Sequence, residues 1–199
     1  MKEDVLEQVV DDYLQLKGYF TTHNLRFRPS ADHPDYETQQ DSVHSDIDVV
    51  GFLPTDRTRR RVVTVTCKSW QAGFDARQKL LQMRGDLSNP KRETWRHFRE
   101  LWQPKWSQAF RDEVERLTGR TQFTYVVAAT KFTGSWSPEQ AETEWNADAT
   151  ISTNLAGNRL EFWELSRMWG EVVAAMTHTT ANSEIGRLAQ LLKAAGLTE

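Results

Sequence analysis

Cysteine is almost absent from this sequence, since Cys67 is the only one among 199 residues. A single cysteine cannot form an intramolecular disulfide, which excludes a disulfide-stapled secreted fold and predicts a reducing compartment. No run of apolar residues is long enough to span a bilayer, so we expect no membrane partner. Residues 1–4 carry three charged side chains and lack the apolar core of a signal peptide. Together these absences predict a cytoplasmic protein.

Other missing features narrow the range of functions. The sequence has no glycine-rich phosphate loop, which excludes the common nucleotide hydrolases. Its five histidines are scattered, without the spacing of a zinc site. The formal net charge of −3 argues against a wholly basic nucleic-acid-binding protein but leaves room for a local basic groove. Hydrophobic residues make up 38% and charged residues 27%, so a buried core can form beneath a solvated surface.

Hydrophobic periodicity predicts an α/β fold. Strand patterns cover residues 19–28, 45–53, 60–70, 122–132 and 159–165, and the turn at 54–58 predicts an antiparallel hairpin. Helical patterns cover residues 5–17, 74–87, 92–117 with a break at Pro104, 137–145, 166–178 and 182–195. A polar loop is expected at 29–45. We expect one domain over residues 1–199, a mixed sheet of about four to five strands flanked by helices, with a helical elaboration at about 88–120 and C-terminal helices at about 166–196.

The strand VVTVTCKSW, residues 62–70, ends in a lysine. Side chains alternate across a strand, so Thr66 and Lys68 share one face while Cys67 points to the other and is expected in the core. On the preceding strand, Asp46 and Asp48 also share a face, and a tight hairpin can bring one of them beside the end that carries Lys68. A carboxylate and an ammonium placed together can hold a hard divalent cation and a phosphate.

The order of these motifs resembles that of the PD-(D/E)xK nuclease superfamily, which has the restriction-endonuclease-like fold. The stretch IDVV, residues 47–50, matches the aspartate element, and residues 66–68, TCK, occupy the (D/E)xK element. The resemblance implies that Asp48 binds Mg²⁺, or Mn²⁺ in its place, with help from the main-chain carbonyl of Cys67. It also implies that Lys68 positions the attacking water. Glu7 matches the glutamate of the first helix, with Glu3 as a competitor, and Gln71 matches a polar active-site position.

Thr66 departs from this pattern, because the family has an aspartate or glutamate there as a second metal-binding acid. Thr66 is therefore assigned to the catalytic and metal-binding set with three interpretations open. The site binds metal through Asp48 and the Cys67 carbonyl alone, or Glu7 or Asp46 supplies the missing acid. In the third interpretation the chain is inactive, either naturally or through a deliberate substitution.

Basic and aromatic side chains offer possible nucleic-acid contacts. Phosphate contact and a solubilising surface are both open for two clusters, one in the hairpin turn and one near residue 92. The members assigned to DNA binding are Arg57, Arg59, Arg60, Arg61, Lys91 and Arg92. Trp95, Trp102 and Trp106 follow helical spacing, which favours core packing over base stacking.

The leading hypothesis is a metal-dependent endonuclease that hydrolyses DNA phosphodiester bonds, in restriction, defence or mobile-element DNA processing. The alternative is a catalytically inactive nuclease-fold subunit for DNA binding or assembly. A third, weaker option is a small protein-binding module. Because no separate recognition domain is evident, a homodimer or partner subunits are expected.

Overall fold

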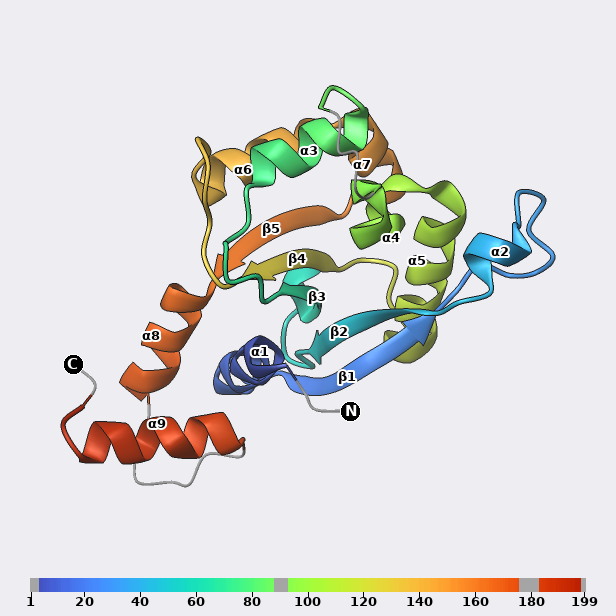
Figure 1. The fold of residues 1–199 in the computed structure, drawn as a ribbon. Coiled ribbons are helices and arrows are strands. Elements are labelled where there is room, and N and C mark those ends of the chain that lie inside the picture. The colour runs from blue at the N-terminus through green and yellow to red at the C-terminus, as the bar shows by residue number, and fades with distance from the viewer. Residues whose placement is uncertain (1–3, 88–92, 176–182, 198–199) are drawn as a thin grey trace.

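The computed structural model describes residues 4–87, 93–175 and 183–197. Its centre is one five-stranded sheet with the strands in sequence order (Figure 1). Strands β1, β2 and β3 pair antiparallel, whereas β3, β4 and β5 pair parallel. Their bounds are Phe20–Phe27 for β1, Ser45–Phe52 for β2, Val62–Lys68 for β3, Thr124–Ala129 for β4 and Arg159–Glu164 for β5. The predicted mixed sheet flanked by helices, including the β2–β3 hairpin, is confirmed.

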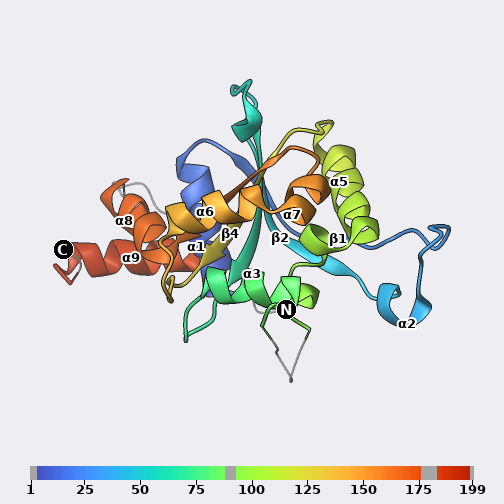
Figure 2. The same ribbon diagram turned by 90° about the horizontal axis from the view of Figure 1, so that it is seen from above.

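Helices cover both faces of this sheet, and the two faces have separate hydrophobic cores. One face packs against α1 (Val5–Leu16) and α8 (Leu165–Ala175), and α9 (Glu184–Ala194) lies against these two helices (Figure 2). The other face packs against five helices. They are α3 (Ala76–Arg84), α4 (Arg99–Trp102), α5 (Pro104–Thr118), α6 (Pro138–Ala147) and α7 (Ala149–Asn154).

Strand alternation divides the side chains of β3 between the two cores. Val63 and Val65 are buried against α1 and α8, and Cys67 packs on this same side. Thr66 has the opposite orientation, as expected from a side-chain period of two. The core position predicted for Cys67 is therefore confirmed. Trp106 is buried in the other core, where Trp95 and Trp102 pack partly buried against it, which confirms the prediction of core packing.

Several element boundaries differ from the predicted ones for local reasons. The segment 92–117 is divided among the 3₁₀ turn Thr94–His97, α4 and α5, and α5 begins at Pro104. Proline lacks an N–H and fits the first turn of a helix, so it starts α5 rather than kinking a longer helix. Similarly, β3 begins at Val62 because a 3₁₀ turn, Arg59–Arg61, precedes it.

Two short helices were not predicted. Asp148 starts α7 directly after α6, because its carboxylate accepts the N–H groups of Thr150 and Ile151. Helix α2 (Thr38–Asp41) lies within the predicted polar loop 29–45. It is held by Asp41, which is fully buried, lies 2.7 Å from the ammonium of Lys105 and accepts the indole N–H of Trp106. Within the described residues, no helix combines the length and apolarity needed to cross a membrane.

Candidate functional site

Polar side chains converge where β2 and β3 stop pairing. The paired register of this hairpin ends at Val49 opposite Val65. One residue further, the Asp48 carboxylate accepts the backbone N–H of Cys67 at 2.5 Å. This bond replaces the missing ladder contact and holds Asp48 against the end of β3. The predicted meeting of Asp48 with the TCK element is therefore present in the structure.

Lys68 completes this cluster from the last position of β3. Its ammonium donates a hydrogen bond to the hydroxyl of Thr66 at 2.9 Å and lies 5.1 Å from the ring centroid of Phe98. Thr66 is only 8% exposed, so its hydroxyl is a buried acceptor. A neutral oxygen and an aromatic face thus fix the position of the lysine side chain.

The surroundings of Asp48 act on its pKa in opposite directions. Burial disfavours the charged carboxylate and raises the pKa of Asp48 above its usual range, and the charge of Asp46 adds to this effect. The N–H of Cys67, the charge of Lys68 and the hydroxyl of Thr66 oppose the rise. Asp46 itself is exposed and lies 3.8 Å from Arg26, so it belongs to the edge of the cluster.

A second acid reaches the same region from α4. Glu100 is 7% exposed and accepts a hydrogen bond from the hydroxyl of Tyr125. Burial raises the pKa of Glu100, repulsion from Asp48 adds to the rise, and attraction to Lys68 opposes it. Burial likewise raises the pKa of Tyr125, and the charges of Glu100 and Asp48 add to the rise. A hydrogen bond with Thr66 opposes it. Glu100 therefore lies within electrostatic reach of both Asp48 and Lys68, and Tyr125 links it to Thr66.

The sequence offered little signal for Glu100. It lies 32 positions after Lys68 in a helical segment and belongs to no recognised motif. The one available hint is its place between the aromatic Phe98 and the apolar Leu101, both of which are fully buried. A charged residue between two core positions is seldom fully buried unless it is paired, so its place in the sequence points to a buried partner.

Glu7 approaches the end of β3 from the other side of the sheet. It lies on α1. Burial raises the pKa of the Cys67 thiol well above its usual range, and the charges of Asp48 and Glu7 add to the rise. Asp4 caps α1 through the N–H of Leu6 and accepts the hydroxyl of Ser69 at 2.5 Å. This contact ties the start of α1 to the end of β3. Glu7 is therefore close to Cys67, but on the face opposite Thr66 and Lys68.

The other residues assigned from the motif have more peripheral positions. Gln71 is exposed in the turn that follows β3. The Cys67 thiol packs into the core beneath α1, so only the backbone of this residue meets Asp48. Of the residues predicted to act in catalysis, the structure brings Asp48, Thr66 and Lys68 together and adds Glu100.

The arginines of the hairpin turn lie at the opposite end of β3 from Lys68. Arg61 directly precedes Val62, and six strand steps from Val62 to Lys68 span about 20 Å. The guanidinium of Arg61 packs over the ring of Phe52 at 5.2 Å. Position along the strand therefore separates this cluster from the predicted catalytic residues.

Two of these arginines are engaged with nearby parts of the fold. Arg59 donates a hydrogen bond to the carbonyl of Gly157 at 3.0 Å, and Arg60 lies 3.5 Å from the carboxylate of Glu161. Arg57 is exposed in the turn. Lys91 and Arg92 lie outside the described residues.

The donor set around Asp48 suits an open metal site better than a closed one. Among the described residues, no group of three or more histidine, cysteine, aspartate or glutamate side chains converges in a way that could hold a metal ion. Asp48 and Glu100 supply two carboxylates, with the Thr66 hydroxyl beside them. Mg²⁺ is commonly held by one or two carboxylates together with waters and substrate phosphates. An ion held by Asp48 and Glu100 would therefore need waters or other oxygen ligands to complete its coordination.

Comparison with known proteins leaves the family open. No protein-family model matches the chain, and no curated protein matches it. Among solved structures, the chain is similar to the crystal structure of the protein of unknown function AF1548, with a TM-score of 0.35 and 12% sequence identity. The match covers 98% of this chain and 79% of that one. A similarity at this level carries no argument about function, so the proposals below rest on the geometry of the chain itself.

Proposed function

We propose that this protein is a metal-dependent endonuclease that hydrolyses DNA phosphodiester bonds. The observation that carries the proposal is the grouping of Asp48, Thr66 and Lys68 at one end of β3, with Glu100 within electrostatic reach of Asp48 and Lys68. Two carboxylates beside an ammonium are a suitable set for a divalent cation and a phosphate together. The resemblance to PD-(D/E)xK nucleases supports the same reaction, in restriction, defence or mobile-element processing of DNA.

Each side chain has a role that follows from its contacts. Mg²⁺, or Mn²⁺, held by Asp48 and Glu100 would supply Lewis-acid polarisation of the phosphate. Lys68 donates hydrogen bonds, so it orients the attacking water and stabilises the negative charge that develops on the phosphate oxygens. Thr66 holds the ammonium of Lys68 by accepting a hydrogen bond, and the ring of Phe98 supports it from the side.

Glu100 compensates for the acid that is missing at Thr66. The interpretation that an acid is supplied from elsewhere in the chain fits the structure best, but the donor is on α4. Neither of the two candidates from the sequence fills this place as well, because Asp46 is exposed and Glu7 lies by Cys67 on the other face. Glu100 is 7% exposed, and the hydroxyl of Tyr125 holds its carboxylate by a hydrogen bond.

A second candidate function is a nuclease-fold subunit that binds DNA without cutting it. The observation in its favour is that the described residues supply no group of three acids, while Lys68 is paired with a neutral threonine. Such a protein would keep the phosphate-binding lysine but hold divalent cations weakly. The proposed experiment separates these two functions.

The test is a cleavage assay on plasmid, short duplex and single-stranded DNA with Mg²⁺ or Mn²⁺. We expect Lys68→Ala to lower the cleavage rate by about 100-fold or more, since removing one positioned donor that stabilises transition-state charge costs about 10²–10³-fold. The matched control is Lys193→Ala, which removes a lysine from α9, far from β3. Equal cleavage by both variants would contradict the proposal.

Two further outcomes distinguish the remaining possibilities. Cleavage that appears only in Thr66→Glu would show that the chain carries an inactivated form of the site. If no variant cleaves but the unaltered chain shifts duplex DNA in a binding assay, the non-catalytic subunit is supported instead. DNA binding is measured on the same samples, and circular dichroism of each variant shows whether it is folded.

A further inference from the structure

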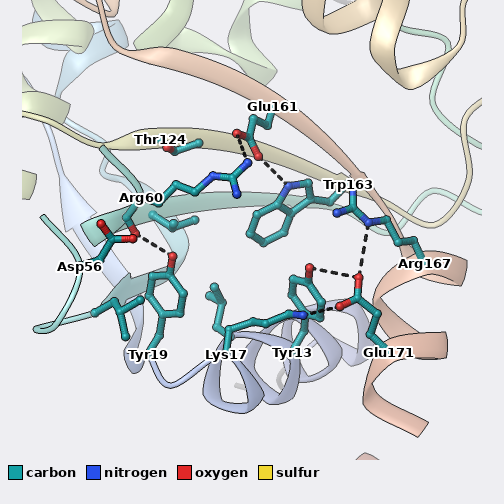
Figure 3. Close-up of a pocket in the computed structure, with 13 residues that line it drawn as sticks. Tyr13, Lys17, Tyr19, Asp56, Arg60, Thr124, Glu161, Trp163, Arg167 and Glu171 are labelled. Atoms are coloured by element: carbon teal, nitrogen blue, oxygen red, sulfur yellow. Dashed lines mark hydrogen bonds and ion pairs between the residues drawn. The ribbon is translucent and has the colours of Figure 1, made fainter. Parts of the chain in front are cut away.

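A second site is suggested by a pocket between α1, β5 and the start of α8 (Figure 3). Its volume is about 390 Å³, within the range of small-molecule sites, roughly 300–1,000 Å³. Val63 and Thr124, near the first positions of β3 and β4, belong to its wall. The pocket therefore lies at the opposite end of β3 from Lys68 and on the opposite face of the sheet.

Three aromatic rings form the apolar part of this pocket. Tyr13 and Trp163 pack edge to face with centroids 5.3 Å apart, and Tyr19 lies across the opening from them (Figure 3). The indole N–H of Trp163 donates to Glu161 at 3.1 Å, and the hydroxyl of Tyr19 donates to the carbonyl of Arg60 at 2.6 Å. These bonds hold the rings in place before any ligand arrives, which lowers the entropic cost of binding.

Charged groups are layered in the pocket, with acids deeper than bases. The side chain of Glu161 is 12% exposed, whereas that of its partner Arg60 is 70% exposed. Glu171 is 35% exposed, against 64% for Arg167 and 44% for Lys17. The inner wall therefore presents rings and a carboxylate, and the rim presents three cations.

The arginine contacts in this pocket are weak enough to be exchanged. Arg60 lies 3.5 Å from Glu161, and Arg167 lies 3.5 Å from Glu171. Both distances are at the limit for a hydrogen bond, and exposed ion pairs of this kind contribute little to stability. A ligand that offers a donor to Glu161 and an anion to the rim can replace these contacts at low cost.

We propose that this pocket binds a nucleoside phosphate whose base carries an exocyclic amine. The base lies against Trp163 and Tyr19, its amine donates to Glu161, and its phosphate is held by Arg60, Arg167 and Lys17. Bases stack on aromatic side chains, carboxylates accept hydrogen bonds from base amines, and guanidinium groups match phosphate geometry.

Simpler ligands leave part of the pocket unused. A polyamine would satisfy the acids but would face the three rim cations at close range. An inorganic anion would satisfy the cations but would leave the rings uncovered, and Glu161 would keep only the indole N–H of Trp163. A ligand that joins a ring, a donor and an anion uses the aromatic rings, Glu161 and the rim cations together. The shared chemistry is available from a free nucleotide or from the 5′-phosphorylated end of a nucleic-acid strand.

Isothermal titration with defined ligands tests this proposal on the intact chain. The ligands are cytidine monophosphate, uridine monophosphate, cytidine, ribose 5-phosphate, spermidine and a 5′-phosphorylated single-stranded oligonucleotide. We expect saturable binding of cytidine monophosphate, with uridine monophosphate and cytidine each about ten-fold weaker because one lacks the amine and the other the phosphate. If the oligonucleotide binds comparably, the ligand is the 5′-phosphorylated strand end. If the oligonucleotide does not bind, the ligand is the free nucleotide.

Variants identify the site within the chain. Arg60→Ala should abolish the preference for the phosphorylated ligand, and Glu161→Gln should abolish the preference for cytidine over uridine. The matched control is Arg120→Ala, an exposed arginine just after α5, which should leave both preferences intact. Since Arg60 is largely exposed, this variant keeps its fold, and circular dichroism confirms it.

Three results would overturn the proposal. Binding of spermidine in place of nucleotides would show that the acids, not the whole wall, select the ligand. Nucleotide binding that survives Arg60→Ala and Glu161→Gln unchanged would place it elsewhere, as would nucleotide binding that is lost in Lys68→Ala. Absence of saturable binding by any nucleotide or oligonucleotide would show that the pocket has no such ligand.

Discussion

Replacing Glu100 by glutamine tests whether the buried acid of α4 takes the place of the acid missing at Thr66. Glutamine has the same shape, and its amide oxygen can still accept the hydroxyl of Tyr125, but it carries no charge. The substitution therefore removes one anionic ligand and leaves the packing in place. The substitution should lower the cleavage rate without lowering the stability. A residue that acts only through the fold would lower both.

The expected loss of activity is large. Removing one of two carboxylates that hold a metal ion should lower cleavage by about 100-fold or more, which corresponds to about 2.7 kcal/mol at 1.36 kcal/mol for each factor of ten. The affinity for Mg²⁺ should fall as well, and isothermal titration measures it without reference to turnover. Glu115→Gln, an exposed acid of α5, is the matched control and should change neither quantity.

Stability should stay constant or rise. Glu100 is 7% exposed, and burial is the largest cause that raises its pKa in the folded chain. A raised pKa means that the contribution of this group to stability is present below its unfolded value and is lost as the pH rises through the folded value. The folded chain therefore disfavours the ionised form of Glu100, and replacing it by an uncharged glutamine should not lower the free energy of unfolding. Urea unfolding followed by tryptophan fluorescence at several pH values measures this.

Restoring an acid at the other position gives the sharpest result. In the Glu100→Gln background, Thr66→Glu should recover cleavage, because it returns the second carboxylate to the position that the motif predicts. Cleavage by Glu100→Gln at the rate of the unaltered chain would refute the assignment of Glu100. A joint loss of activity and of several kcal/mol of stability, without rescue, would show that Glu100 acts only through the fold.

Three further predictions concern buried groups. Lys105→Met should lower the unfolding free energy by about 3–5 kcal/mol, because it leaves the fully buried carboxylate of Asp41 without its ammonium partner. Asp41→Asn in the same chain should recover most of this loss in thermal unfolding, and additive losses would contradict the prediction. Burial raises the pKa of Asp48, so its ionisation lowers the unfolding free energy as the pH rises, and Asp48→Asn should gain stability relative to the unaltered chain between acid and neutral pH; a difference between the two chains that stays constant with pH in urea unfolding would refute it. Phe74→Ala should cost about 3–5 kcal/mol in urea unfolding, since Phe74 is fully buried among aromatic rings, and a loss below about 1 kcal/mol would show that the site refills.

Local pattern was enough to predict most elements of the fold. The period of two in residues 62–68 placed Val63 and Val65 in one core and Thr66 on the opposite face, because alternation follows from strand geometry alone. The antiparallel hairpin followed from a short turn between two strands. The helices α2 and α7 were missed, because each depends on a buried or capping aspartate whose partners lie elsewhere in the chain or emerge only with the helix.

The candidate site divides in the same way between local and distant contributions. Asp48, Thr66 and Lys68 were predictable, because hairpin register and strand alternation bring them together over about 20 residues. Glu100 was not, since its place beside Lys68 depends on how α4 packs on the sheet. The arginines of the hairpin turn show the converse, because nearness in sequence to β3 did not place them near Lys68.

The sequence by itself determined the mixed α/β architecture and the meeting of Asp48 with the end of β3 that carries Lys68. Periodicity and short turns encode these features, and both act over a few residues. Only the tertiary structure decided that Glu100 comes within electrostatic reach of Lys68, that α1, which carries Glu7, covers the opposite face of the sheet, and that α1, β5 and α8 enclose a pocket. These depend on the packing of helices from distant parts of the chain, which no local pattern specifies.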